Sequence, residues 1–130
     1  MIAGVGTDIV EIARIQAALA RHGEAFSRRV LTDEELAELG RRAAPDVFLA
    51  GRWAAKEAVS KALGVGIGEA CAWRDIHVRN DSRGRAHVTL SGDAGRTAAG
   101  LGVRRVHVSI SHEREYACAT AILESADPVT

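Results

Sequence analysis

The segment PDVFLAGRWAAKEAVSKALG, residues 45–64, decides the fold because it reads as one long helix. Pro45 suits a first helical turn, where its missing N–H is harmless, and Gly64 is typical of a helix end. At about 100° per residue, one side of this helix is apolar and Arg52 lies near its edge. The other side is predicted to carry the polar and large groups Trp53, Lys56, Glu57, Ser60 and Lys61.

The segments around this helix alternate between strand and helix patterns. Residues 2–11 read as a buried strand, 12–22 as a helix ended by Gly23, and 32–39 as an acidic helix begun by a Thr32–Glu35 capping box. Downstream, strands are expected at 75–81, 86–90, 103–112 and 116–124, with a helix at 92–101 that Ser91 could cap. The order of these elements predicts one α+β domain over residues 1–130.

Composition excludes several classes of protein. The 17 basic and 17 acidic residues cancel, which argues against a general nucleic-acid binder. No apolar run approaches the roughly 20 residues of a membrane span, and no secretory signal pattern opens the chain. Cys71 and Cys118 have no metal-site spacing, so we expect free thiols in a reducing cytoplasm. With 13 glycines and only 4% aromatic residues, the chain has little bulky apolar material, and we expect it to bury surface against another subunit.

The two lysines and two carboxylates are the strongest chemical signal. Lys56 and Lys61 are the only lysines among 17 basic residues, and Glu57 stands beside them. An ordinary i,i+4 pair of Glu57 with Lys61 would also explain this spacing. Asp8 shares a strand face with Gly4 and Gly6, where a ligand or another backbone can approach closely. Two carboxylates with adjacent ammonium groups suit a magnesium ion and phosphates.

Other candidate groups are weaker. His112 ends the strand-like VSISH beside Ser109 and Ser111, whereas the other four histidines read as surface or satisfied residues. The turn GVGIG, residues 64–68, could offer N–H groups to phosphate, but it lacks the P-loop and dinucleotide patterns and reads better as a helix stop followed by a turn. A serine hydrolase lacks its G-x-S-x-G elbow, and neither cysteine lies in a nucleophile motif.

Three motifs together resemble one family. GVGTDIVEIARI, FLAGRWAAKEAVSKALGVGIG and VSISHEREYACA look like the holo-acyl-carrier-protein synthases, the small 4′-phosphopantetheinyl transferases. The resemblance covers nearly the whole chain in the family's order. It implies a mainly antiparallel sheet packed with helices, assembled as a trimer, and transfer of 4′-phosphopantetheine from coenzyme A to a serine of acyl carrier protein for fatty acid biosynthesis, with release of adenosine 3′,5′-bisphosphate.

The resemblance also assigns roles to residues. Asp8 and Glu57 would hold Mg²⁺ against the coenzyme A pyrophosphate, and either could be the base for the serine hydroxyl. Lys61 would neutralise phosphates, with Lys56 and Arg52 as further phosphate contacts. The nucleotide's 3′-phosphate end would meet His112 and its serines, Ser111 among them. Arg14 would dock the acidic carrier protein, and Arg21 lies on the same helix face. Residues 40–46 carry no motif that transfers a contact.

Two rivals remain open at the level of sequence. A noncatalytic module that binds coenzyme A or a nucleotide could keep the same fold, and a transferase could serve a specialised carrier protein. The first would be expected to lack Asp8, Glu57 or Lys61, and all three are present.

Overall fold

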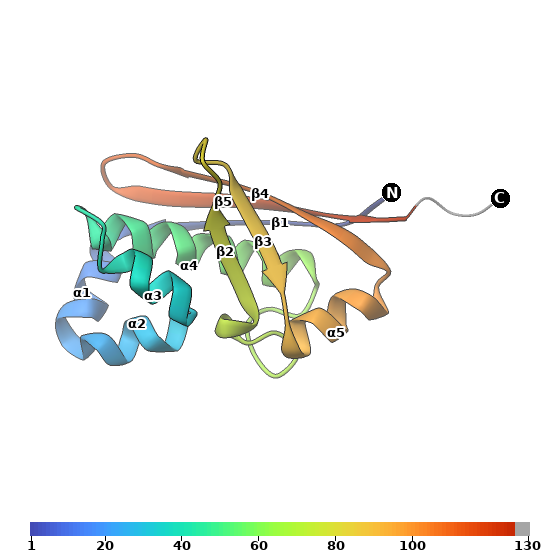
Figure 1. The fold of residues 1–130 in the computed structure, drawn as a ribbon, viewed down its shortest axis with the longest axis horizontal. Coiled ribbons are helices and arrows are strands. Elements are labelled where there is room, and N and C mark those ends of the chain that lie inside the picture. Colours follow the sequence, from blue (N-terminus) through green and yellow to red (C-terminus); the bar gives the residue numbers. More distant parts are fainter. Residues whose placement is uncertain (127–130) are drawn as a thin grey trace.

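The computed structural model describes residues 1–126, which form five helices, one short 3-10 helix and five strands (Figure 1). In chain order these elements are β1 (Ile2–Glu11), α1 (Ile12–His22), α2 (Glu24–Val30), α3 (Asp33–Leu39), α4 (Pro45–Ala62), η1 (Trp73–Asp75), β2 (Ile76–Asn80), β3 (Ala86–Leu90), α5 (Gly92–Gly100), β4 (Val103–His112) and β5 (Tyr116–Ser125). None of these helices is long and apolar enough to cross a membrane. The α+β class expected from the sequence is confirmed.

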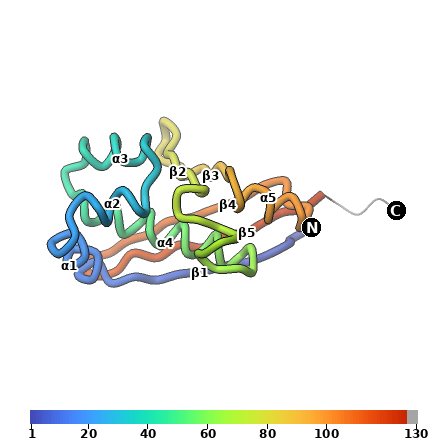
Figure 2. Tube along the Cα trace, turned by 90° about the horizontal axis from the view of Figure 1, so that it is seen from below, coloured from blue at the N-terminus to red at the C-terminus, as the bar shows by residue number. Residues whose placement is uncertain are grey.

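The long strands form a three-stranded antiparallel sheet in the order β1-β5-β4, and β2 pairs with β3 in a separate antiparallel hairpin. The three long strands run along the longest dimension of the molecule, with α1, α2 and α3 gathered towards one end and α5 towards the other (Figure 1). Helix α4 lies alongside these strands, as the turned view also shows (Figure 2). The two edges of the sheet are therefore β1 and β4.

Helix α4 packs against one face of the sheet, and small residues allow this close approach. The inward positions of β5 are Ala117, Ala119, Ala121 and Leu123, all buried. On β1, a Cβ added to Gly6 would lie 2.6 Å from the backbone nitrogen of Ala62 and closer still to the carbonyl oxygen of Ala58. The glycine-lined face of β1 thus accommodates the backbone of α4, one of the two alternatives open from the sequence.

Nothing in residues 1–126 covers the opposite face of the sheet. Val5 and Ile9 of β1 are 60% and 67% exposed, and Tyr116 and Ile122 of β5 also lie on this outer face. Registered pairs such as Val5 with Ile122 bring these side chains together across the two strands. An apolar sheet face of this kind is typical of a surface that another protein chain covers.

The predicted polar side of α4 is wrong in part. Lys56 and Ser60 are fully buried. Lys56 lies against α2, α3 and η1, where Val30, Glu35 and Trp73 accept its hydrogen bonds. Helix α2 is also absent from the sequence prediction, which left residues 24–30 unassigned. Its seven residues follow Gly23, which ends α1 with φ 58°.

The local stop and start signals are mostly confirmed. Thr32 and Glu35 form the predicted capping box of α3. Gly64 and Gly66 have φ 79° and 68°, as a turn after α4 requires. Ser91 stands at the N-cap of α5, but its side chain does not cap the helix; its hydroxyl donates to the backbone oxygen of Asp75 at 3.4 Å.

Candidate active site

Asp8, Glu57 and Lys61 come together where β1 crosses α4. Nζ of Lys61 lies 3.0 Å from Oδ1 of Asp8 and 3.2 Å from the backbone oxygen of Thr7. Asp8 follows Gly4 and Gly6 on the inner face of β1, so the same close packing that joins strand and helix also brings its carboxylate to α4. The side chain of Asp8 is 13% exposed and that of Lys61 is 50% exposed, so the cluster opens to solvent on the lysine side.

The electrostatics of this cluster favour a cation. Burial, and then the nearby Asp8 carboxylate, raise the pKa of Glu57, while Lys61 opposes the rise. Two carboxylates that repel each other at a half-buried position gain from a positive ion between them. The lysine supplies part of that charge in the free chain.

The donor set fits a magnesium ion that takes most of its ligands from water and substrate. Within residues 1–126, no group of three or more His, Cys, Asp or Glu side chains could enclose a metal. Magnesium usually binds through one or two carboxylates together with waters and phosphate oxygens. Asp8 and Glu57 therefore match this ion better than zinc, which needs three or four protein ligands.

A second candidate region is an open cleft of about 750 Å³ on the β4 side of α4. Its walls include Arg42, Phe48, Arg52, Arg85 and His112. The cleft is basic: within the described part of the chain, its titratable lining residues are the three arginines and His112, with no carboxylate among them.

Arg52 is the most informative residue in this cleft. Its side chain is buried, and its guanidinium lies 4.5 Å from the centre of the Phe48 ring. Nε of Arg52 is buried and has no hydrogen-bond partner among the residues that the structure describes. Burial lowers the pKa of Arg52 from its usual value, with Glu35 opposing the change. A buried guanidinium with an unsatisfied donor beside an open basic cleft is suited to an anion.

The two candidate regions lie on opposite sides of α4. Asp8 belongs to β1 and His112 to β4, which are the two edges of the sheet with β5 between them. On the helix, Arg52 and Glu57 are five residues apart, about 140° around the axis. One chain therefore does not place both regions around a single cavity.

Comparison with known proteins now decides the family. The model of the 4′-phosphopantetheinyl transferase superfamily matches residues 4–121. This chain belongs to the 4′-phosphopantetheinyl transferase superfamily. It is 51% identical over 124 residues to the holo-[acyl-carrier-protein] synthase of Vibrio cholerae, covering 95% of this chain and 98% of that protein.

Solved structures of the family agree with the fold. The holo-[acyl-carrier-protein] synthase of Neisseria meningitidis is similar with a TM-score of 0.91 and 38% identity, over 96% of this chain and 100% of that one. The Helicobacter pylori synthase, solved in complex with coenzyme A, has a TM-score of 0.82 and 32% identity, over 92% and 99% of the two chains.

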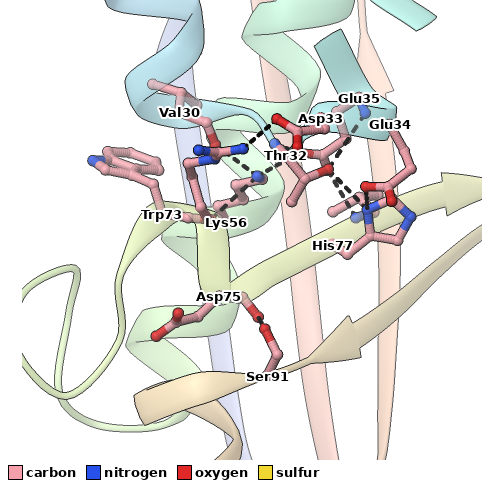
Figure 3. Close-up of polar contacts among 12 residues, drawn as sticks. Val30, Thr32, Asp33, Glu34, Glu35, Lys56, Trp73, Asp75, His77 and Ser91 are labelled. Atoms are coloured by element: carbon pink, nitrogen blue, oxygen red, sulfur yellow. Dashed lines mark hydrogen bonds and ion pairs between the residues drawn. The ribbon is translucent and has the colours of Figure 1, made fainter. Parts of the chain in front are cut away.

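Not every residue assigned to the transferase site from the sequence is placed to act there. Lys56 is fully buried, and its ammonium donates to Glu35 and to two backbone oxygens, so the expectation that it contacts phosphate is wrong (Figure 3). Ser111 and His112 are successive strand residues and point to opposite faces of the sheet. Of the expected cluster, His112 and Ser109 line the basic cleft, whereas Ser111 does not.

Four further arginines are exposed on α1 or line the basic cleft. Arg14 and Arg21 are exposed on α1, and neither pairs with an acidic side chain among residues 1–126. Arg42 and Arg85 line the cleft but escaped sequence reasoning. Arg42 lies in the motif-free 40–46 segment, where its only signal is the doubled arginine shortly before Pro45.

Proposed function

We propose that this chain is a single-domain holo-[acyl-carrier-protein] synthase. It transfers 4′-phosphopantetheine from coenzyme A to a serine of apo acyl carrier protein, for fatty acid biosynthesis, and releases adenosine 3′,5′-bisphosphate. The observation that carries the proposal is the meeting of Asp8, Glu57 and Lys61 at the β1–α4 contact. The names of the curated relatives and the coenzyme A complex of the Helicobacter pylori protein support it.

The reaction requires no covalent bond between the protein and the substrate. The serine oxygen forms a bond to the β-phosphorus of coenzyme A, and the bond from that phosphorus to the bridging oxygen of the pyrophosphate breaks. The leaving group is the nucleotide's 5′-phosphate, and the serine proton goes to a base. Asp8 and Glu57 are the candidate bases, directly or through water. Its raised pKa makes Glu57 a better proton acceptor than an ordinary surface glutamate.

Charge on the phosphates is the main obstacle, and the cluster addresses it. Magnesium, held by Asp8 and Glu57, would neutralise the pyrophosphate and stabilise the charge that develops on its oxygens. Lys61 is half exposed, and its ammonium can move from Asp8 to a phosphate oxygen when substrate binds. The enzyme is therefore proposed to be magnesium-dependent, with coenzyme A as co-substrate.

The basic cleft is proposed to hold the nucleotide end of coenzyme A. Arg52, with its unsatisfied Nε, and His112 would contact the 3′-phosphate, and Arg42 adds a further positive charge. This end carries the phosphate that distinguishes coenzyme A from its dephosphorylated precursor. The cleft thus supplies specificity at a distance from the reacting phosphorus.

A trimer would complete the site. We propose that three copies meet through the uncovered face of the sheet, burying Val5, Ile9, Tyr116 and Ile122. Around a threefold axis, the β1 edge of one sheet lies next to the β4 edge of the following one. One subunit then contributes Asp8 and Glu57, and its neighbour contributes the basic cleft.

The assembly is tested by Ile9→Arg, which places a charge on this face. Sedimentation should show three times the 13.8 kDa chain mass for the parent and a smaller species for the variant, with transfer lost in proportion. Thr7→Arg, an exposed position on the same strand face, is a second disruptive variant. A fully active monomer of either variant would contradict a shared site.

The acidic carrier protein is proposed to dock on α1 through Arg14 and Arg21. Both guanidiniums are free to pair with carboxylates, and such contacts steer association in a salt-dependent way. We also propose a cytoplasmic location. The free thiols Cys71 and Cys118 support a reducing compartment.

Mass spectrometry tests the proposed activity directly. Apo acyl carrier protein incubated with the chain, coenzyme A and Mg²⁺ should gain one phosphopantetheine group. Coenzyme A should be consumed in an equal amount. Omitting Mg²⁺ should abolish the gain. Binding of coenzyme A without any transfer to a panel of apo carrier proteins would instead make the chain a noncatalytic binding module, and transfer only to a specialised carrier protein would redirect its role.

A further inference from the structure

Lys56 occupies an unusual position for a lysine, because its ammonium is fully buried beside the candidate active site. Nζ donates to the backbone oxygen of Val30 at 2.7 Å, to Oε1 of Glu35 at 2.6 Å and to the backbone oxygen of Trp73 at 3.2 Å (Figure 3). All three ammonium hydrogens therefore have acceptors. No donor remains for a phosphate.

Glu35 is equally buried and equally satisfied. Its Oε1 accepts from the backbone N–H of Thr32 at 2.8 Å in the capping box, and Oε2 accepts from the backbone N–H of Val78 at 2.8 Å. The side chain is 1% exposed. The Lys56–Glu35 pair thus makes hydrogen bonds to the end of α2, the start of α3, η1 and β2.

These bonds join the carrier-docking end of the molecule to α4. Val30 is the last residue of α2, which follows the docking helix α1 directly. Lys56 precedes Glu57 on α4, so its side chain ties α2 to the helix turn that holds the candidate metal ligand. Opposite Lys56, β1 approaches α4 so closely that a Cβ on Gly6 would clash with the helix backbone. The helix is therefore held from both sides.

An aromatic stack reinforces the same junction. The backbone carbonyl of Trp73 accepts a hydrogen bond from Lys56, and the centre of the Trp73 ring lies 4.4 Å from the centre of the Trp53 ring on α4. The Trp53 ring in turn lies 5.7 Å from that of Phe26 on α2. The hydrogen bonds of Lys56 and the contacts between these three aromatic rings thus both join α2, α4 and η1.

Stability alone is a poor reason for a buried charge pair. Replacing such pairs with apolar residues is often neutral or stabilising, whereas breaking one partner is strongly destabilising. The pair does fix geometry. Three hydrogen-bond acceptors on three elements hold the Lys56 side chain in one orientation. The arrangement suits a site that needs accurate placement.

We propose that Lys56, paired with Glu35, is a positioning residue that fixes the Glu57-bearing turn of α4 relative to the docking helices α1 and α2. The inference rests on the proposed transferase function. It assigns the pair to the alignment of the docked serine with the β-phosphorus of coenzyme A. The groups proposed to bind coenzyme A lie on β1, on α4 and in the basic cleft rather than on α2, so we expect loss of the pair to lower the transfer rate more than the affinity for coenzyme A.

The test compares Lys56→Met with the neutral pair Lys56→Met/Glu35→Gln, which removes both buried charges together. Transfer to apo acyl carrier protein is measured at 10 °C, and the rate is expressed per coenzyme A site counted by isothermal titration with Mg²⁺. In the variants kcat should fall by about 10-fold or more, while the Kd for coenzyme A stays within about twofold of the parent. Arg74→Gln is the matched control, since it breaks the neighbouring but exposed Arg74–Asp33 pair and should change neither value.

Each other result decides against the inference. A folded double variant with the parent's kcat would overturn it, as would a parallel loss of coenzyme A affinity. Failure of both variants to fold at 10 °C would assign the pair to folding only. A parent chain that shows no transfer would instead refute the proposed function, so the two failures are distinguishable.

Discussion

Replacing Gly6 with alanine tests whether strand–helix packing sets the geometry of the active site. The new Cβ would lie 2.6 Å from the backbone nitrogen of Ala62, and ordinary contact begins at 3.4 Å. Backbone atoms cannot rotate away, so α4 and β1 must separate by about 0.8 Å at this atom, and by more at the Ala58 carbonyl. Asp8 is two residues further along β1, so the same displacement separates its carboxylate from Glu57 and Lys61.

The size of the effect follows from this displacement. Overpacking a close-packed core costs about 1–3 kcal/mol, and a clash with backbone belongs at the upper end. For a chain of this size that lowers Tm by about 10 °C. A displacement near 1 Å between catalytic groups lowers the transfer rate by about 100-fold.

The assay combines a thermal melt with mass-spectrometric transfer measured well below the variant's Tm. Gly100→Ala is the control, because a Cβ there meets nothing within 4 Å and Gly100 lies at the far end of α5. The control should keep its rate and melt at or slightly above the parent's Tm, because alanine favours a helix more than glycine does. If Gly6→Ala melts within 2 °C or so of the parent and transfers at the parent's rate, the close packing does not set the site.

Three further outcomes are expected. Glu57→Gln should abolish transfer yet raise Tm at pH 8. Burial and Asp8 raise the pKa of Glu57, so the folded state is penalised while Glu57 is ionised; the gain in Tm should shrink as pH falls below that raised pKa and be gone below the ordinary glutamate pKa. An unchanged rate would remove Glu57 from the proposed metal site. Arg52→Gln should raise the KM for coenzyme A by about 10-fold or more and leave that for 3′-dephospho-coenzyme A nearly unchanged; equal losses would place the 3′-phosphate elsewhere. Arg14→Glu should raise the KM for carrier protein, weaken its salt dependence and spare coenzyme A binding, whereas an unaltered KM would move the docking surface off α1.

Local signals made most of the fold predictable. The strand at 2–11 and the helix at 12–22 were expected with the bounds that the structure shows, because a period of two gives way there to a helical period that Gly23 ends. The capping box of Thr32 and Glu35 similarly predicted the start of α3. Helix α2 has no such signal: its seven residues are helical because Phe26 and Val30 pack on neighbouring elements.

The candidate site was predictable where a residue is stable in only a few kinds of surroundings. An aspartate in an apolar, glycine-lined strand needs a partner, and Asp8 has one in Lys61. Lys56 shows where such reasoning fails. Helical periodicity counts a lysine as polar and assigns it to the surface, whereas its partner Glu35 lies 21 residues earlier and joins it only in the folded chain. The basic cleft could not be predicted for the same reason, since its arginines come from three separate segments that meet only in the folded chain.

The placement of Asp8 and His112 at opposite edges of one sheet has a genetic consequence. A chain defective in Glu57 still carries an intact basic cleft, and a chain defective in Arg52 still carries an intact carboxylate cluster. In the proposed trimer, a neighbouring pair of these chains in the right order combines the two intact halves. Two defective alleles in equal amounts would therefore complement each other, with about a quarter of the sites carrying both intact halves after random assembly.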